Sequence, residues 1–235
     1  MSRTLRKAAL VCAAAGLALT AAAPQGVAAK AVRPYAIQPV HNVTFIQASQ
    51  NIAPRTGGDD FLVTMSTTST GALKIPFTLR PYGEARTSMV VSSNGNIQFP
   101  GKGTDPNVAW TNACLPTHMP SPFIAPYWDD LQFAATGTTT PNEGIYVKTT
   151  GTAPHRQFIV NWRGHLFGQD TAATRFGVIF YEGVSKISFQ YMDNTASNAT
   201  IGTQDRPATT STQWTCDSGG TSVQTGLRLD FIQQR

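Results

Sequence analysis

Short runs of β-prone residues, separated by turn-forming residues at intervals of about 8 to 12 positions, make up most of the chain. After the N-terminal region, no window of about a dozen residues places apolar side chains at the i, i+3, i+4 spacing of an amphipathic helix. Many short strands with regular turns are typical of sandwiches and barrels. The sequence therefore predicts an all-β fold, an antiparallel β-sandwich of roughly ten to twelve strands with one long-range disulfide.

The clearest local signal is a hairpin at Asn94-Gly95. Residues 89–92 and 96–99, on either side of it, are rich in β-prone side chains. Asn and Gly both tolerate the positive φ of a two-residue type I′ turn, so that turn is predicted here.

Further strands are predicted where apolar side chains alternate with polar ones or run together between turn signals. A proline within such a run, as at Pro76, confines the strand to a sheet edge or end. The Pro- and Gly-rich connection 100–122 has no periodicity. A segment of that length would be mobile unless a contact such as a disulfide fixed it to the rest of the domain. The other predicted strands are 41–46, 61–65, 75–79, 124–133, 157–163, 176–181, 187–191, 200–204 and 227–232.

The first 29 residues have the order of a secretory signal peptide. Arg3, Arg6 and Lys7 precede an apolar run that ends near Ala23, and cleavage is expected after Ala29. The apolar run is shorter than the roughly 20 residues of a comfortable membrane span. A secreted chain with no membrane span in its mature form is expected.

The predicted organisation after the signal peptide is a linker followed by one domain. Residues 30–39 contain two prolines and no periodicity, and residues 40–235 form the single domain. The signal peptide holds three of the 18 basic residues and none of the 13 acidic ones, so its removal lowers the net charge from +5 to +2. This small charge gives no reason to expect nucleic acid as a partner.

Two cysteines remain once Cys12 leaves with the signal peptide. Cys114 and Cys216 are predicted to pair, because an exported chain reaches an oxidising compartment. A bridge closing a loop of about 100 residues is worth roughly 4 to 5 kcal/mol in the chain-entropy model. The alternative is a pair of free buried thiols.

Several segments, taken in their order and spacing, carry a family resemblance over about residues 40–233. They are residues 90–99, Cys114-Leu115-Pro116, and residues 124–131, 144–146, 156–162, 199–202 and 215–227. This set resembles the nidogen-related (NIDO-like) β-sandwich domains of bacterial exported proteins. The resemblance implies a disulfide between the loop before the Trp-Asp-Asp segment and the loop before the last strand. It also implies an extracellular module, since animal relatives are associated with cell-matrix adhesion.

Asp129 and Asp130 are the candidate functional carboxylates. As neighbours on a strand they are expected to point to opposite sides, which disfavours an acid and base pair made by these two alone. Ca²⁺ binding with loop carbonyls and a distant Asp193 or Asp205 is one interpretation. The favoured one is that Asp130 accepts backbone N–H bonds and Asp129 is solvated. No metal or cofactor is expected.

Four tryptophans are candidates for a stacking platform. Trp128 and Trp162 lie in β-patterned runs and are expected to fill the core. Trp110 and Trp214 lie near the two cysteines, and an aromatic binding face is predicted at that pair if one exists.

The functional hypothesis is a monomeric, secreted, non-enzymatic module that recognises an extracellular protein or polysaccharide through its loops. One alternative is a hydrolase of extracellular polymers that uses carboxylates such as Asp129, Asp130 or Glu143, which requires two carboxyl groups facing one cleft. The other alternative is a structural envelope-associated protein without a ligand.

Overall fold

The computed structural model describes most of the chain after residue 31. The ranges are 32–53, 57–63, 73–101, 105–120, 122–134, 142–169, 173–193, 198–206, 208–216 and 223–234. They belong to a single unit, Val32–Arg235. The predicted signal peptide, residues 1–29, lies outside the described residues.

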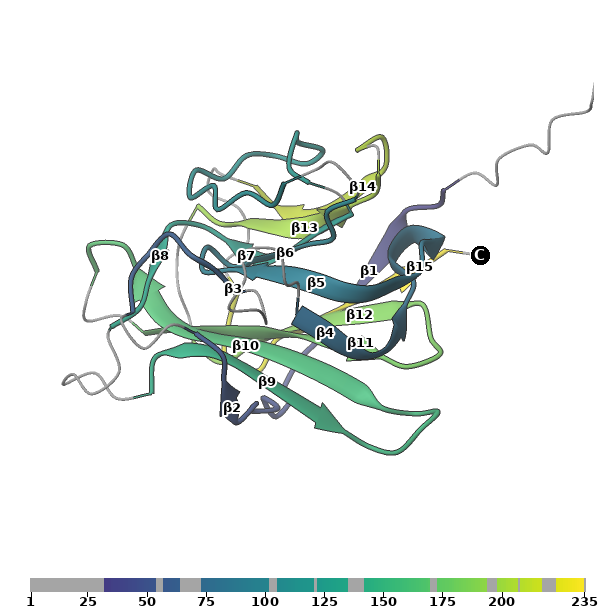
Figure 1. The fold of residues 1–235 in the computed structure, drawn as a ribbon, viewed down its shortest axis with the longest axis horizontal. Coiled ribbons are helices and arrows are strands. Elements are labelled where there is room, and N and C mark those ends of the chain that lie inside the picture. The colour runs from purple at the N-terminus through teal and green to yellow at the C-terminus, as the bar shows by residue number, and fades with distance from the viewer. Residues whose placement is uncertain are drawn as a thin grey trace, which may run out of the picture. The chain divides into compact units, whose positions relative to one another are not determined.

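Two antiparallel sheets pack face to face in this unit (Figure 1). The larger sheet has the order β1 (Tyr35–Val40), β15 (Arg228–Gln233), β12 (Lys186–Tyr191), β11 (Ala173–Tyr181), β10 (Gln157–Leu166), β9 (Gly144–Thr150) and β2 (Gln50–Asn51), with β8 (Leu131–Gln132) also paired to β10. The smaller sheet has the order β14 (Ser211–Thr215), β13 (Thr200–Gln204), β7 (Phe123–Trp128), β6 (Asn96–Gln98), β5 (Arg86–Ser92) and β3 (Leu62–Val63), with β4 (Leu73–Leu79) also paired to β5.

The predicted all-β sandwich is confirmed. The described residues contain 15 strands, more than predicted, but β2, β3 and β8 have only two residues each. Their only helical element is the single 3₁₀ turn η1 (Pro81–Gly83) between β4 and β5. No helix in the described ranges is long and apolar enough to cross a membrane.

The N-terminal part of the domain corrects the sequence prediction. Residues 35–39 of the predicted linker belong to β1, which pairs with β15 at the edge of the larger sheet. Pro39 is tolerated because an edge strand has one side without ladder hydrogen bonds. The Thr212 hydroxyl accepts the Tyr35 N–H (3.0 Å) and donates to the Tyr35 carbonyl (2.9 Å), which joins β1 to β14 of the other sheet. Tertiary pairing thus makes a strand where the local pattern shows none.

Residues 41–46, predicted as a strand, are irregular and cross the outer face of the larger sheet. Ile46 and Ala48 pack there with Tyr146, Ile159 and Ile179. The backbone of this segment pairs with no strand of the described residues. The Val43 N–H donates to the Gly226 carbonyl, and the Gln190 side chain bonds the backbone of Ile46. The apolar side chains that suggested a strand therefore cover the sheet instead of extending it.

The hairpin of β5 and β6 has a three-residue loop, because Ser92 pairs with Asn96. Gly95 has φ of 68°, whereas Asn94 does not have a positive φ. The predicted hairpin is confirmed, but the type I′ turn is wrong. One Gly in the left-handed region after two loop residues is the usual geometry of three-residue hairpins.

Aromatic side chains fill the space between the sheets. Trp162 stacks on Phe176 with ring centroids 5.0 Å apart, and Tyr127 packs against Phe176 at 5.0 Å from the other sheet. Phe189 and Phe231 lie 4.4 Å apart in the same core. Trp162 is fully buried, which confirms its predicted core position.

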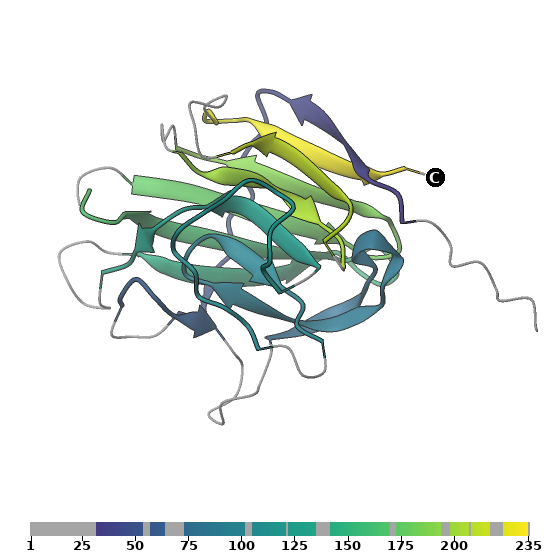
Figure 2. The same cartoon turned by 90° about the horizontal axis from the view of Figure 1, so that it is seen from above.

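The 105–120 connection forms an additional layer over the outer face of the smaller sheet (Figure 2). Trp128 and Phe123 project outward from β7 and pack with Met119 and Leu115 of this connection. Trp128 is 1 % exposed, but it lies beneath this loop layer and not between the sheets, so the expectation that it fills the core of the sandwich is corrected.

Glutamine side chains hold the irregular layers onto the sheets by a repeated arrangement. In each case the amide oxygen accepts the N–H of one loop residue, and the amide nitrogen donates to the carbonyl of that same residue. Such pairing satisfies backbone groups that would otherwise be buried without partners. The pairs are Gln98 with Asn107, Gln190 with Ile46, and Gln204 with Thr117.

Candidate functional site

Two Asp-Asp pairs that lie far apart in the sequence meet at one end of the sandwich. Gly58 and Phe133 form an isolated antiparallel bridge, in which each N–H donates to the other's carbonyl over 2.9 Å. The Phe61 and Phe133 rings pack at 5.5 Å beside this bridge. The pair at 59–60 and the pair at 129–130 are thereby held next to each other.

The two pairs share a local geometry. Asp59 Oδ1 accepts the N–H of Asp60, and Asp129 Oδ1 accepts the N–H of Asp130, both over 2.9 Å. Asp129 and Asp130 lie in the connection between β7 and β8, not on a strand as predicted. Asp130 was expected to accept a backbone N–H with its carboxylate. In the structure Asp129 does so, and the N–H that it accepts belongs to Asp130.

Asn94, in the β5–β6 turn, connects the segments around these carboxylates. Its Nδ2 donates to Asp60 Oδ1 (2.8 Å) and to the Val108 carbonyl (2.7 Å), and its Oδ1 accepts the Leu131 N–H (3.0 Å). Asn94 is fully buried, and so is its bond to the Leu131 N–H, whereas its bonds to Asp60 and Val108 are partly buried. One amide side chain therefore fixes three segments of the chain relative to the turn.

The carboxylates affect one another electrostatically. Burial raises the pKa of Asp130 above its usual value, and the negative charges of Asp60, Asp59 and Asp129 raise it further. No Arg, Lys or His of the described residues forms an ion pair with Asp59, Asp60 or Asp130. The end of the sandwich is thus rich in hydrogen-bond acceptors.

Two of the most exposed aromatic side chains belong to segments that are hydrogen-bonded to the segments holding the carboxylates. Phe167 is 53 % exposed, and its N–H donates to the Asp130 carbonyl over 3.0 Å. Trp110 is also 53 % exposed and follows Ala109, whose carbonyl accepts Trp128 Nε1–H over 2.9 Å. We call the set Asp59, Asp60, Trp110, Asp129, Asp130 and Phe167 the acidic-aromatic surface.

The predicted aromatic pair does not share one environment. Trp214 is partly buried and packs against the core between the sheets. Gln213, its neighbour on β14, points the other way and bonds the disulfide loop through its side chain. Of the two tryptophans, only Trp110 is exposed.

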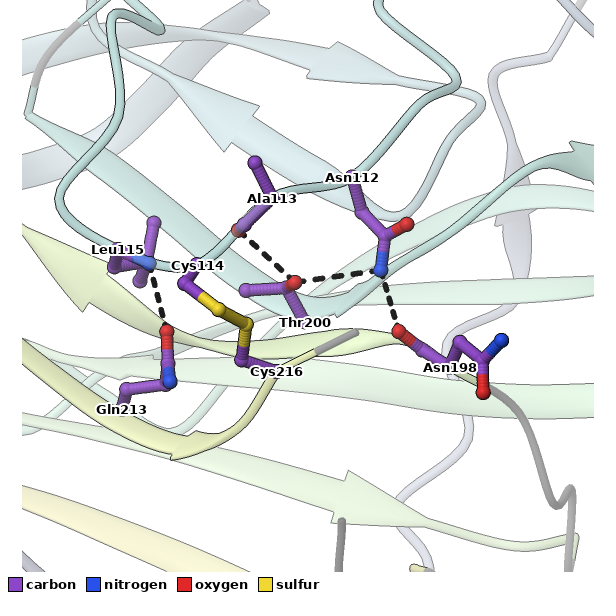
Figure 3. Close-up of a disulfide and its surroundings, with 8 residues drawn as sticks. All are labelled: Asn112, Ala113, Cys114, Leu115, Asn198, Thr200, Gln213 and Cys216. Carbon is purple, nitrogen blue, oxygen red and sulfur yellow. Dashed lines mark hydrogen bonds between the residues drawn. A yellow bond between two sulfur atoms is a disulfide. The ribbon is translucent and has the colours of Figure 1, made fainter. Parts of the chain in front are cut away.

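The predicted disulfide is confirmed (Figure 3). Cys114 and Cys216 have Cα atoms 5.1 Å apart and are separated by 102 residues. Thr200 Oγ1 donates to the Ala113 carbonyl (3.0 Å), and Gln213 Oε1 accepts the Leu115 N–H (2.7 Å). Asn112 Nδ2 donates to the Asn198 carbonyl (2.5 Å). The segment that follows Trp110 is therefore tied to β13 and β14.

Asp193 and Asp205, the two distant aspartates of the calcium interpretation, have other partners and do not support it. Asp193 forms an ion pair with Arg175, and Asp205 accepts the N–H groups of Thr209 and Thr210. In the described ranges no group of three or more His, Cys, Asp and Glu side chains is arranged to hold a metal ion.

Glu143, named for the hydrolase alternative, has a partner that the sequence did not indicate. Glu143 Oε1 lies 3.0 Å from His165 Nδ1, and Glu143 Oε2 accepts the Ala134 N–H. Both side chains of the pair are largely buried. The carboxylate of Glu143 therefore has two structural contacts.

Sequence reasoning missed Asp59, Asp60, Asn94 and Phe167. One signal was available for the first two, because the chain contains only two Asp-Asp doublets and an apolar residue follows each. Nothing in the local sequence distinguishes Phe167 from the buried phenylalanines.

Comparisons with known proteins agree with this architecture at the level of the family. No curated protein and no solved structure matches the chain. The family model described as NIDO related matches residues 42–228, which include β2 to β14 and both cysteines. An extracellular type of domain and a disulfide are compatible with secretion. By this match, the chain belongs to the NIDO-related family.

Proposed function

We propose that this chain is a secreted, non-catalytic recognition module that binds an extracellular polysaccharide at the acidic-aromatic surface. The observation that carries the proposal is that two half-exposed aromatic residues, Trp110 and Phe167, belong to segments that are hydrogen-bonded to the segments holding four carboxylates.

The chemistry of this surface suits a sugar ligand. Ionised carboxylates only accept hydrogen bonds, and sugar hydroxyls are donors. Aromatic rings offer apolar faces on which the C–H face of a pyranose ring packs. A surface with both features matches a ligand that has hydroxyl edges and apolar faces.

The supporting residues are rigidly held, which favours recognition by a preformed site. Asn94 fixes the Asp60 carboxylate, and the disulfide lies four residues after Trp110. A binding site that is ordered before the ligand arrives loses less entropy on binding.

Binding without turnover is proposed because the carboxylates are already engaged in structural bonds. Asp59 and Asp129 accept the N–H of the following residue, and Asp60 accepts from Asn94. The clefts beside Tyr35 and beside Phe158 are lined by other residues, and none of the described residues that line them is Asp or Glu. A glycosidase requires two carboxyl groups about 5 to 10 Å apart across one cleft.

The test is an array of extracellular polysaccharides, with extracellular proteins on the same array, probed with the mature chain and three variants. Trp110→Ala and Phe167→Ala each remove one ring. Val184→Ala is the matched control, because Val184 is an apolar residue, 60 % exposed, in the β11–β12 turn.

We expect saturable binding to at least one polysaccharide, with affinity lowered at least tenfold in the two ring variants and unchanged in Val184→Ala. Binding to proteins alone, or equal binding by all variants, would contradict the proposed ligand and site. Release of shorter sugars from the bound polysaccharide over time would contradict the absence of catalysis.

A further inference from the structure

A second surface, distinct from the acidic-aromatic surface, lies where the two sheets open between β4 and β9. A cleft of about 430 Å³ separates these strands. This volume is in the range of sites for small molecules or short peptides. Nothing in the proposed function uses this cleft.

The floor of the cleft is apolar. Ile75 of β4, Val147 of β9 and Phe158 of β10 line it, and their exposed fractions are only 3 %, 6 % and 4 % because they also belong to the core. A ligand that enters the cleft therefore meets side chains of both sheets.

The rim of the cleft is positively charged. Lys74 and Lys148 line it from opposite strands, and both are exposed. Neither ammonium group has an ion pair or side-chain hydrogen bond with the described residues, and none of those that line the cleft is Asp or Glu. The charge of this rim is complementary to an anionic ligand.

Free strand edges border the cleft. β2 pairs with β9 only at Val147 and Tyr146, so residues 148–150 have no strand on that side among the described residues. β4 pairs with β5 alone in the same set. Such edges expose backbone N–H and C=O groups to an incoming strand.

We propose that this cleft binds an acidic peptide of another protein in extended conformation, added as a strand along the free edge of β9. Alternate side chains of an extended peptide point to opposite sides. Apolar residues of the peptide therefore face Ile75, Val147 and Phe158, while acidic residues between them reach Lys74 and Lys148.

The strand edge is the reason to prefer a peptide to an anionic saccharide. Strand addition takes its affinity from main-chain hydrogen bonds and its specificity from alternate side chains. A sulfated or uronate-containing saccharide matches the two lysines but has no regular series of amide groups for the edge.

The test uses fluorescence anisotropy with a labelled hexapeptide in which Glu and Val alternate. Three comparison ligands accompany it: the same peptide with alternate backbone nitrogens methylated, a hexapeptide of alternating Lys and Val, and a sulfated oligosaccharide. The protein is the mature chain, the double variant Lys74→Glu/Lys148→Glu, and Arg80→Glu. Arg80 is an exposed basic residue next to the end of β4 that does not line this cleft.

We expect the Glu-Val peptide to bind the mature chain and Arg80→Glu equally. Affinity should fall at least tenfold in the double variant and at least tenfold on N-methylation, and the Lys-Val peptide should not bind. If the double variant unfolds thermally with the same midpoint temperature as the wild type, it is folded. Absence of binding, insensitivity to charge reversal, or tighter binding of the sulfated oligosaccharide with no effect of N-methylation would overturn the proposal.

Discussion

The side chain of Asn94 donates a hydrogen bond to the carboxylate of Asp60 over 2.8 Å, although the two residues lie in different loops. The same amide bonds the backbone of Val108 and of Leu131. Asn94 therefore links the β5–β6 turn to both Asp-Asp pairs and to the segment that carries Trp110. This link explains how irregular segments hold a defined surface.

Replacement of Asn94 by Ala should destabilise the domain by about 2 to 4 kcal/mol. The change leaves buried groups, including the Leu131 N–H, without partners, and each such group costs roughly 1 to 3 kcal/mol. Guanidinium unfolding measures the loss. Asn198→Ala is the control, because the Asn198 residue is exposed and, among the described residues, its backbone carbonyl and not its side chain forms a hydrogen bond. A loss below about 0.5 kcal/mol in Asn94→Ala would argue against the role given to this residue.

Replacement of Gly95 by Ala should cost more than the same change at Gly168. Both glycines have positive φ, 68° and 71°, so each variant carries the left-handed strain of roughly 1 to 2 kcal/mol. A Cβ at Gly95 would also lie 1.8 Å from the Tyr127 carbonyl oxygen, whereas a Cβ at Gly168 meets nothing within 4 Å. We expect Gly168→Ala to fold normally and Gly95→Ala to lose at least twice as much unfolding free energy, or to fail to fold. Equal losses in denaturant unfolding would refute the close approach of the β5–β6 turn to β7.

Replacement of Asp130 by Asn should stabilise the protein at neutral pH. Because its pKa is raised in the folded state, the stability that this group contributes is present below its usual pKa and is lost as the pH rises through the raised value. The neutral amide removes this loss, so Asp130→Asn should exceed the wild type by about 0.2 to 1 kcal/mol at pH 7, a small gain because the group is partly solvated.

The pH dependence distinguishes a gain that comes from removing the ionisable group of Asp130 from a gain in stability that is the same at every pH. The gain should disappear near pH 3 to 4, roughly the pH at which an unperturbed Asp becomes protonated. Thermal unfolding of the wild type and of Asp130→Asn across this pH range gives the comparison. A variant that is less stable than the wild type at pH 7 would mean that the Asp130 carboxylate has a favourable partner.

Replacement of both Cys114 and Cys216 by Ser should lower the free energy of unfolding by roughly 4 to 5 kcal/mol, as the chain-entropy model predicts for a loop of this length. The far-ultraviolet circular dichroism spectrum should keep its β signature at 20 °C, roughly room temperature, because the sheets have their own core. Unfolding of the wild type with a reductant should reproduce the loss. A change below about 1 kcal/mol would show that the hydrogen bonds of Thr200 and Gln213 hold this loop without the bridge.

Local sequence was sufficient for the parts of the fold whose signals are local. Alternation and turn residues identified the strands that became β10, β11, β12, β13 and β15, and two cysteines in a chain expected to be exported implied the bridge. Trp110, Asp129 and Asp130 were named as candidate site residues from the sequence. How they are arranged relative to one another could not be predicted.

The remaining features depend on contacts between distant segments. β1 is a strand because β15 offers an edge and Thr212 bonds Tyr35. The segment 41–46 is not one, because its backbone finds other partners: the Gly226 carbonyl for Val43 and the Gln190 side chain for Ile46. The apolar side chains of 41–46 can be buried either in a strand or in an irregular segment that lies on the sheet.

The sequence by itself therefore determined the class of fold and the cysteine pair, because periodicity and composition act locally. Only the tertiary structure decided that Asp59 and Asp60 join Asp129 and Asp130, through the bridge between Gly58 and Phe133. The physical reason is that backbone groups at the end of the sandwich must find partners, and which partners they find depends on the packing of the whole domain.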